Sequence, residues 1–313
     1  MASRRGDLPT DIGAFGPWIG SFELSLQIAE RSPKTIEIYT DAARWLAQWL
    51  TKTTKVRSWG DVSRDELRLF FLYMQEIEYA RGYRNNIGRA LQAFFKWYAA
   101  EEEVPDPFDK FKAPPPEKLG AKRKPIIETE QMAVLIKDAE RGKGFEDRRD
   151  AALLRLFAAT GCRLAEITGL ELDDVNVAKR TALVTGKGGK QRVVKFDVKA
   201  ALALDRYLRK RAEHKASRFT NALWIGVRRS VPMTPSGVRQ IVRRRGARLG
   251  MKIHPHLFRH TFTHNCLDAG MEEGDLMELN GWESRQMLLL YGSVAKGARA
   301  QRAYDRIDVM RGV

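Results

Sequence analysis

The sequence predicts a mostly helical α+β protein in two parts, a leading helical bundle and a larger helical domain that contains one small β-hairpin or sheet. Three observations support this fold class. Apolar residues recur at helical spacing along most of the 313 residues. β-Branched runs flank a glycine-rich turn at one place, residues 186–189. A proline-rich stretch divides the chain, and each part is long enough to bury its own core.

The first part is expected to be a four-helix bundle. Ser32 and Pro33 are typical of an N-cap and a first-turn proline, and residues 63–66 form a capping box before an apolar-striped segment. Further helices are expected near residues 18–29 and 85–100. The five tryptophans of this part fit the spacing of a helical core better than base stacking. The expected divisions are a flexible N-terminus (1–15), the bundle (16–104), a linker (105–125) and a second domain (126–313).

The linker is expected to be extended and basic. Residues 104–125 hold six prolines and six Lys or Arg residues, and proline at that density excludes both a helix and a central strand. We expect Lys122, Arg123 and Lys124 to lie along a negatively charged partner. The alternative is a solvated tether.

The second domain is expected to be helical from Ile126 onward, with one break. The runs TALVT and RVVKF flank Gly186-Lys187-Gly188-Gly189, which indicates a β-hairpin between Asp173 and Asp197. A further short strand is expected at LWIG, residues 223–226. Helices resume after Asp197 and continue to the end of the sequence.

The charge of the chain favours a nucleic-acid partner. Lys and Arg number 55 against 39 Asp and Glu, a formal net charge of +16, and such an excess is typical of proteins that bind polyanions. No run approaches the ~18 apolar residues that a bilayer-spanning helix needs. The N-terminus lacks the apolar stretch of a signal peptide. Cys162 and Cys266 are expected to be reduced core residues, which favours a cytoplasmic protein.

Five segments of the second domain suit one reaction, the cleavage of a phosphodiester without a metal. That reaction needs a nucleophile, cations that neutralise the non-bridging phosphate oxygens, and an acid that protonates the leaving 5′ oxygen. Arginine forks match phosphate oxygens, a lysine on a flexible turn can act as the acid, and tyrosine can attack phosphorus. The segments are ATGCRLAEITGL with Arg163, the glycine-rich turn with Lys187, HPHLFRH with His256 and Arg259, NGW with Trp282, and LLLYG with Tyr291.

In order and spacing, this set resembles the catalytic residues of the tyrosine recombinases, the family of phage integrases and of Xer-type and Cre-type enzymes. ATGCRLAEITGL is similar to the family's first arginine box, GKGGKQRVV to its lysine hairpin, and HPHLFRHTFTH to its second box. The resemblance covers the whole second domain, and the leading bundle resembles the family's core-binding domain. It implies a site-specific DNA recombinase, or integrase, that works through a 3′-phosphotyrosine and needs no cofactor and no metal.

The resemblance also implies a role for each matching residue. Glu166, one turn after Arg163, corresponds to the acidic residue that orients the site. Most of the family has histidine where this chain has Trp282, and an indole N–H can donate to phosphate but cannot act as acid or base. The other implied roles are the phosphate clamp (Arg163, Arg259), the general acid (Lys187), the group that assists proton transfer (His256) and the nucleophile (Tyr291).

Some of these residues have other interpretations. Taken alone, Arg163 and Glu166 would be an ordinary ion pair at i, i+3. The histidines at 256, 260 and 264 recur every four residues, but Arg259 lies among them and no carboxylate or cysteine cluster joins them, so a metal site is disfavoured. Tyr304 is a rival nucleophile that lacks the spacing to Trp282.

The arginine-rich segment VRQIVRRRGARLG is expected to contact DNA. It holds five arginines in ten residues with no acid among them, which favours phosphate contact over a solvated face. The residues expected at DNA are Arg239, Arg243, Arg244 and Arg245.

Three functions follow from these residues. The first is a site-specific recombinase; the alternatives are a type IB topoisomerase-like nicking–closing enzyme and a DNA-binding protein that has lost catalysis. The presence of every catalytic residue disfavours the last. The expected partner is double-stranded DNA with specific core sites. The resemblance implies a monomer in free solution and a homotetramer on paired sites, joined by exchange of a C-terminal helix after Ala298. An accessory directionality factor is compatible with it, and no membrane partner is expected.

Overall fold

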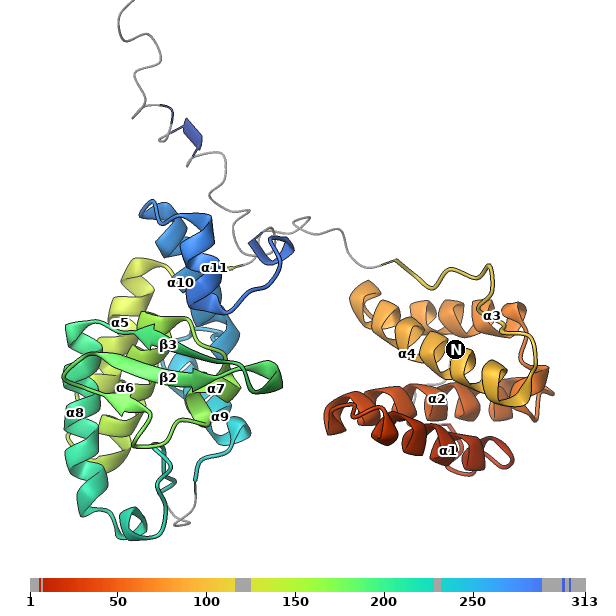
Figure 1. The fold of residues 1–313 in the computed structure, drawn as a ribbon, viewed down its shortest axis with the longest axis horizontal. Helices are drawn as coiled ribbons and strands as arrows, with labels where there is room; N and C mark the ends of the chain where they lie inside the picture. Colours follow the sequence, from red (N-terminus) through yellow and green to blue (C-terminus); the bar gives the residue numbers. More distant parts are fainter. Residues whose placement is uncertain are drawn as a thin grey trace, which may run out of the picture. The chain divides into compact units, whose positions relative to one another are not determined.

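The computed structural model describes residues 6, 8–115, 125–227, 232–288, 300, 301 and 304. The chain divides into two compact units, Met1–Lys118 and Leu119–Val313, which Figure 1 colours from red to yellow and from yellow to blue along the sequence. The protein is mostly helical with one small antiparallel sheet, as the sequence predicts. In the part of the chain that is described, no helix is long and apolar enough to cross a membrane.

The first unit is a bundle of four helices, and two of them start at a capping serine. Ser32 accepts a hydrogen bond from the backbone N–H of Thr35 at 3.2 Å, and Ser63 and Glu66 form the predicted capping box. Both predicted helix starts are thereby confirmed. The helices are α1 (Phe15–Ile28), α2 (Pro33–Thr53), α3 (Arg64–Glu76) and α4 (Arg81–Glu102).

Aromatic side chains fill the core of this unit. Trp45, Trp49 and Trp59 are buried, and Trp18 and Trp97 are partly buried against the same cluster. The indole of Trp59, in the turn before α3, donates to the carbonyl of Phe15 at 3.1 Å. The interpretation of the five tryptophans as core residues is confirmed.

Residues 105–115 belong to the first unit, so the predicted linker is too long at its start. Phe108 is buried in the core, and Phe111 stacks on Phe71 of α3 with ring centroids 5.9 Å apart. Proline excludes regular structure here but not packing, and the two phenylalanines anchor the segment. Residues 116–124, with the predicted DNA contacts of Lys122, Arg123 and Lys124, lie outside the described residues.

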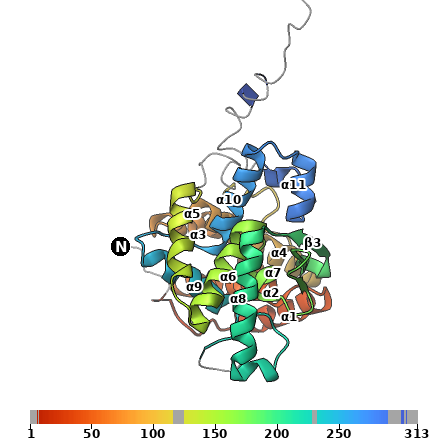
Figure 2. The ribbon, with the colours of Figure 1, turned by 90° about the vertical axis from the view of Figure 1, so that its left-hand side faces the viewer.

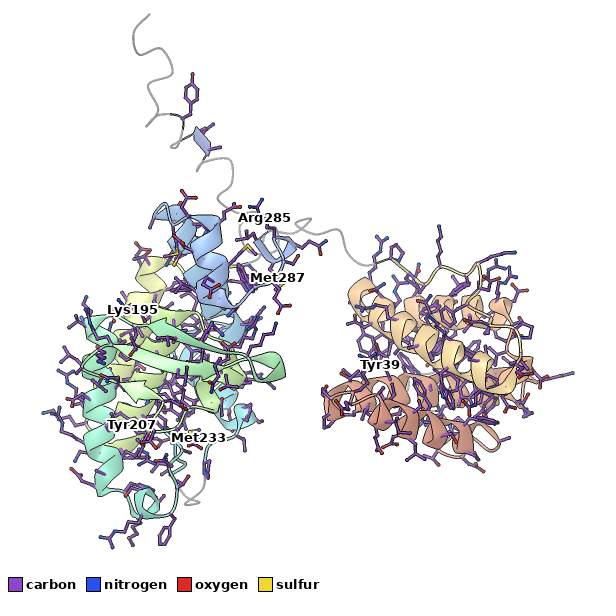
Figure 3. The ribbon with its side chains drawn as sticks, in the orientation of Figure 1. Tyr39, Lys195, Tyr207, Met233, Arg285 and Met287 are labelled. Atoms are coloured by element: carbon purple, nitrogen blue, oxygen red, sulfur yellow. The ribbon has the colours of Figure 1, made fainter. Side chains whose placement is uncertain are left out.

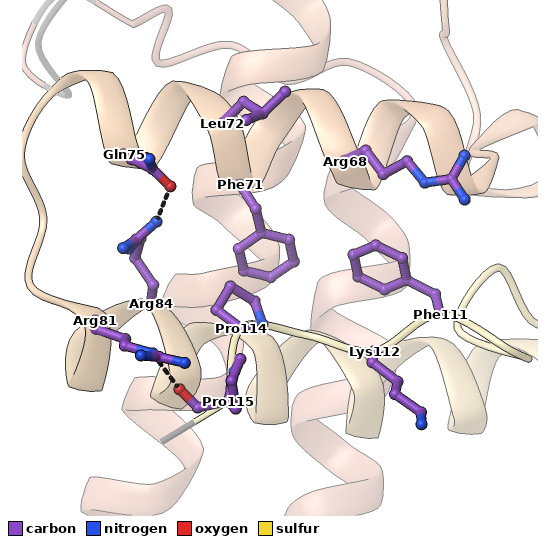
Figure 4. Close-up of a pocket in the computed structure, with 10 residues that line it drawn as sticks. All are labelled: Arg68, Phe71, Leu72, Gln75, Arg81, Arg84, Phe111, Lys112, Pro114 and Pro115. Carbon is purple, nitrogen blue, oxygen red and sulfur yellow. Dashed lines mark hydrogen bonds between the residues drawn. The ribbon is translucent and has the colours of Figure 1, made fainter. Parts of the chain in front are cut away.

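Residues 105–115 cross α3 and α4 beside a hollow of 520 Å³, shown in Figure 4. Two arginines of α4 border it: Arg81 donates to the carbonyl of Pro115 at 3.1 Å, and Arg84 to the side chain of Gln75 at 2.7 Å. The crossing needs a residue without a side chain in α4. A Cβ atom at Gly88 would lie 2.5 Å from the Cβ of Ala113.

In the second unit, the other helices and one sheet surround the buried helix α6. Helix α6 packs against α5, α8 and α10, and α7 packs beside β2 and α9; Figure 2 views this unit from the side of α8. The helices are α5 (Thr129–Glu140), α6 (Phe145–Thr160), α7 (Leu164–Thr168), α8 (Val198–Glu213), α9 (Pro235–Ala247), α10 (Pro255–Asp268) and α11 (Glu273–Asn280).

The predicted hairpin is confirmed and gains one short strand. Strands β2 (Thr181–Thr185) and β3 (Gln191–Lys195) pair antiparallel, with Thr185 opposite Gln191 beside the turn, and β1 (Val175–Asn176) pairs with β2. Successive side chains of β2 point to opposite faces of the sheet, and Ala182 and Val184 point into the core.

The predicted strand at residues 223–226 is wrong, because only isolated bridges form there. Buried arginines take carbonyls that a strand partner would otherwise bind. Arg211 donates to the carbonyls of Ala222 and Leu223, and Arg149 donates to that of Ile225 at 3.3 Å.

Candidate active site

The first arginine box lies where α6 ends and α7 begins. Gly161 ends α6 with a φ of 59°, and a Cβ atom there would lie 2.5 Å from the ring of Phe262, so this position requires glycine. Cys162 is buried. Arg163 then caps α7 in an extended conformation, and its side chain stays 38% exposed. The chain reversal therefore presents Arg163 at the surface beside a buried thiol.

Glu166 is the buried carboxylate of this region. Its oxygens accept hydrogen bonds from the backbone N–H of Arg163 at 2.7 Å and from that side chain at 2.8 Å. Both guanidinium Nη atoms of Arg192 donate to it as well, each at 2.9 Å. Burial alone would raise the pKa of Glu166, but the hydrogen bonds from Arg192 and Arg163 outweigh it and lower the pKa to about 2. Glu166 is therefore a fixed negative charge.

Arg192 is a site residue that the sequence argument missed. It lies on β3, and its side chain is 12% exposed. Besides Glu166, it binds the carbonyl of Leu279 through Nε at 2.8 Å and approaches the sulfur of Cys162 at 3.8 Å. One signal was present in the sequence: Arg192 shares a face of β3 with the buried Val194, and a cation on the buried face of a strand needs an acidic partner.

Arg259 and His256 come from the first turns of α10 and have different surroundings. Arg259 is 1% exposed, and its Nη1 donates to the carbonyl of Gly161 at 3.0 Å. His256 is exposed, and its ring meets that of His260 edge-on with centroids 4.7 Å apart. Three positions apart on α10, the two residues share one helix face, which holds one buried cation and one accessible imidazole.

The C-terminal end of α11 brings the arginines together. The carbonyl end of a helix carries partial negative charge and attracts cations. Gly281, with a φ of 59°, turns the chain away from the helix at this point. Three arginines from three different elements donate to three consecutive carbonyls here: Arg192 to Leu279 at 2.8 Å, Arg259 to Asn280 at 2.7 Å, and Arg163 to Gly281 at a long 3.5 Å.

The hairpin turn closes one side of a hollow next to this cluster. Gly188 and Gly189 have φ values of 73° and 75°, which glycine adopts without strain. The backbone of Lys187 is in this turn, and its side chain is outside what the structure describes. Lys190 of the turn forms an exposed ion pair with Glu283. The hollow measures 690 Å³, and its lining includes Arg163, Gly186, Lys190, Arg192, Gly281, Trp282 and Glu283.

Trp282 follows Gly281 and is buried. It packs with Leu267, Leu276 and Leu288, and Figure 3 labels Met287 on the short segment that continues from it. Tyr291, the predicted nucleophile, lies outside the described residues. Its rival Tyr304 is an exposed side chain.

The arginines of α9 differ in exposure, and the burial of Arg245 corrects the expectation that this residue contacts DNA. Arg245 is buried, and its guanidinium donates hydrogen bonds to Asp150 at 2.9 Å and to Asp147 at 3.0 Å. Arg244 pairs with Glu146 and Asp150. The acids that α9 itself lacks come from α6. Arg239, Arg243 and Arg244 are exposed and border a separate hollow of 630 Å³.

No group of three or more histidine, cysteine or carboxylate side chains suited to a metal ion occurs among residues 8–115, 125–227 and 232–288. The site consists instead of arginines held by one buried carboxylate and by main-chain carbonyls. Such an array can neutralise charge on a phosphate.

A family model and the curated relatives of this chain point to the same family. The model of the phage integrase family matches residues 125–297. The curated relatives include the tyrosine recombinase XerC of Roseiflexus sp. (strain RS-1), which is 29% identical over 82% of this chain and 83% of its own. XerC of Anoxybacillus flavithermus is 31% identical over 77% of this chain and 81% of its own.

Solved structures share the fold. The Tn1549 transposon integrase in complex with transposon right end DNA is 18% identical, covers 94% of this chain and 99% of its own, and has a TM-score of 0.72. A lambda integrase dimer bound to a COC′ core site is 15% identical, covers 88% and 94%, and has a TM-score of 0.66. Both structures match across both units of the chain.

Proposed function

The chain belongs to the phage integrase family and is a tyrosine recombinase, a site-specific DNA recombinase; on that premise we propose that it cuts and rejoins DNA through a 3′-phosphotyrosine formed by Tyr291. Arg163 and Arg259 hold the scissile phosphate, and Lys187 is the general acid. DNA is the substrate, and the proposed place of action is the cytoplasm, at the nucleoid.

One observation carries the proposal: Arg163 and Arg259, 96 positions apart in the sequence, donate to consecutive carbonyls at the end of α11. Carbonyls of adjacent residues are a few ångströms apart, so the two guanidiniums meet in one place. Each guanidinium has five N–H donors. Two guanidiniums at one place match the two non-bridging oxygens of a single phosphate.

The reaction proceeds by in-line displacement. Tyr291 loses its proton with the help of His256, and its oxygen bonds to phosphorus while the bond from phosphorus to the 5′ oxygen breaks. Lys187 gives its proton to that leaving oxygen. The arginines neutralise the charge that grows on the non-bridging oxygens. The 3′-phosphotyrosine conserves the energy of the diester, so a 5′ hydroxyl can later reverse the step without ATP.

Other residues of the site hold or support these groups. Glu166 orients Arg163, since it binds that residue through both the backbone and the side chain. His256 is exposed on the first turn of α10 and assists proton transfer at the tyrosine. Trp282 packs beside Arg259 and binds phosphate through its indole N–H.

The test is a suicide substrate with a nick beside the cleavage point, which traps the covalent complex on a denaturing gel. Tyr291→Phe is expected to abolish the trapped band and to bind the duplex normally, because one hydroxyl is removed; Tyr304→Phe is the matched control and is expected to react. A trapped band with Tyr291→Phe and none with Tyr304→Phe would reverse the assignment. Relaxation of any supercoiled plasmid, without a particular site, would favour the topoisomerase-like alternative.

The assembly on DNA is proposed to be a homotetramer on paired core sites, formed from monomers and open to an accessory directionality factor. DNA contacts are proposed for the bundle at 16–104, for Lys122, Arg123 and Lys124, and for Arg239, Arg243 and Arg244. After Ala298, residues Ala300, Ala303, Tyr304, Ile307 and Met310 recur at helical spacing and form an apolar stripe. This helix would dock on a neighbouring protomer, because the stripe needs a surface to bury it. Truncation after Ala298 is expected to keep single-site binding and to remove two-site complexes on native gels. Equal two-site complexes with and without the tail would contradict the exchange.

A further inference from the structure

We propose that Arg192 is a positioning residue for the general acid: it fixes the hairpin turn that carries Lys187 against the C-terminal end of α11. The inference rests on the proposed function, in which Lys187 protonates the leaving oxygen. It assigns Arg192 no contact with DNA.

The bonds of Arg192 join three parts of the second unit. The residue is on β3, five positions after Lys187. Its Nε donates to the carbonyl of Leu279 on α11 at 2.8 Å, and its two Nη atoms donate to the two carboxylate oxygens of Glu166 on α7 at 2.9 Å. The planar fork of arginine makes both sets of bonds at once, which the single ammonium of lysine cannot reproduce.

The backbone closes on this guanidinium from two sides. A Cβ atom at Gly281, after α11, would lie 3.3 Å from Nη1 of Arg192. A Cβ atom at Gly186, the first residue of the turn, would lie 3.5 Å from Glu166 Oε1 and 3.9 Å from the same Nη1. The start of the turn therefore lies directly against the Arg192–Glu166 pair, and loss of the pair removes the surface on which it rests.

Arg163 depends less on Arg192 than the turn does. Without Arg192, Glu166 still receives the backbone N–H and the side chain of Arg163, at 2.7 and 2.8 Å. The backbone N–H of Gly186 closes the turn by donating to the carbonyl of Lys190 at 2.7 Å, but fewer contacts hold the turn against α11. Gly188 and Gly189 have no side chains, and the pair between Lys190 and Glu283 is about three-quarters exposed on both sides, which gives it little strength. Loss of Arg192 is therefore expected to displace Lys187 before it displaces the phosphate clamp.

The test uses the leaving group to separate these effects. In a substrate with sulfur in place of the bridging 5′ oxygen, attack by Tyr291 breaks a phosphorus–sulfur bond. The sulfur departs as a thiolate, because a thiol has a pKa of only ~8.5 and needs no proton from an acid. A defect that acts through the general acid disappears on this substrate. A defect in the phosphate clamp, or a general loss of structure, persists.

Single-turnover cleavage is compared on the oxygen and sulfur substrates with the full chain. Arg192→Gln and Arg192→Lys are expected to slow cleavage of the oxygen substrate by about 10- to 100-fold, the scale of a misplaced catalytic group, and to cleave the sulfur substrate within about threefold of wild type. Lys187→Ala is expected to follow the same pattern with a larger loss, about 10²- to 10⁴-fold. Arg163→Ala is expected to be slow on both substrates.

Lys195→Gln is the matched control. Lys195 is an exposed cation at the end of β3 far from the turn, labelled in Figure 3, and its replacement is expected to change neither rate. Thermal melting and binding to a core-site duplex verify that each variant is folded. If Arg192→Gln does not fold because Glu166 loses a buried partner, Arg192→Lys keeps the charge and carries the comparison.

The outcomes separate the inference from the function beneath it. Rescue of both Lys187→Ala and the Arg192 variants by sulfur supports the inference. Rescue of Lys187→Ala alone overturns it and leaves the proposed acid in place. Failure of sulfur to rescue Lys187→Ala overturns the role of Lys187, and the role of Arg192 with it.

Discussion

The guanidinium carbon of Arg259 lies 5.2 Å from the centre of the Trp282 ring, while the same guanidinium donates to the carbonyls of Gly161 and Asn280. The indole thus forms one wall of the pocket that holds the buried cation. We therefore expect Trp282 to act through this packing as much as through any bond to DNA, because the face of an aromatic ring attracts a cation.

The two residues should therefore respond differently to substitution. Arg259→Ala is expected to slow cleavage by about 10²- to 10³-fold or more, since it removes donors aimed at charge that forms in the transition state. Trp282→Phe keeps a ring beside the cation and is expected to cost about tenfold or less. The measurement is single-turnover cleavage of a suicide substrate, with DNA binding as the control. Equal losses for the two variants would contradict a packing role for Trp282.

The pKa of Glu166 gives the second unit a pH-dependent stability. Because folding lowers this pKa from 4.5 to about 2, the stabilisation is complete above pH ~4.5 and is lost as the pH falls from there towards 2. The depression corresponds to about 3 kcal/mol. Chemical unfolding of the wild type and of Glu166→Gln, compared between pH 6 and pH 2.5, is expected to show a steeper fall for the wild type. Parallel pH curves would show that Glu166 is not held ionised by its arginines.

Gly88 tests the packing of residues 105–115 on the first unit. Glycine to alanine inside a helix normally stabilises by about 1 kcal/mol, but a Cβ here would lie 2.5 Å from that of Ala113, and overpacking costs about 1–3 kcal/mol. Gly88→Ala is therefore expected to destabilise the unit. The double variant Gly88→Ala/Ala113→Gly moves the methyl group across the contact and should recover the loss. Tryptophan fluorescence in urea is a suitable measurement, since five of the seven tryptophans are in this unit. A double variant less stable than Gly88→Ala would contradict the contact.

The arginines of α9 should separate into binding and structural residues. Arg239→Gln/Arg243→Gln is expected to weaken DNA binding and to reduce the slope of log K against log salt by about 0.9 for each lost phosphate contact, with unchanged melting. Arg245→Gln removes the arginine partner of Asp147 and one of the three arginines that bind Asp150, where Arg149 and Arg244 remain. It is therefore expected to lose about 1–3 kcal/mol of stability. Fluorescence anisotropy over a salt series and thermal melting measure the two effects. An unchanged salt slope in the double variant would remove Arg239 and Arg243 from the interface.

Local signals predicted the elements of the fold well. Ser32 and Ser63 cap helices by bonding backbone atoms two or three residues away, and Gly161 ends α6 through its own φ. These interactions need no information from distant parts of the chain. The hairpin likewise follows from its turn and its flanking β-branched runs.

Contacts between distant elements were the part that the sequence did not reveal. Arg192 meets Glu166 across 26 positions, and Arg245 meets Asp150 across 95. From the sequence alone, an arginine in a basic segment is interpreted as a surface cation, because its acidic partner is far away in the sequence. The strand expected at residues 223–226 failed for a related reason, because the carbonyls of Leu223 and Ile225 bind arginine side chains from α8 and α6.

The end of α11 has one more consequence. The three groups that bind the arginines here are main-chain carbonyls, which every residue type has. The identities of the residues at positions 279 and 280 therefore do not determine these bonds. The number of residues in α11 determines these bonds. Adding or deleting one residue in α11 would rotate its last turn by about 100° and advance it by about 1.5 Å, which would turn all three oxygens away from their cations at once. The spacing from Glu273 to Gly281 therefore constrains this site in a way that no single substitution reveals.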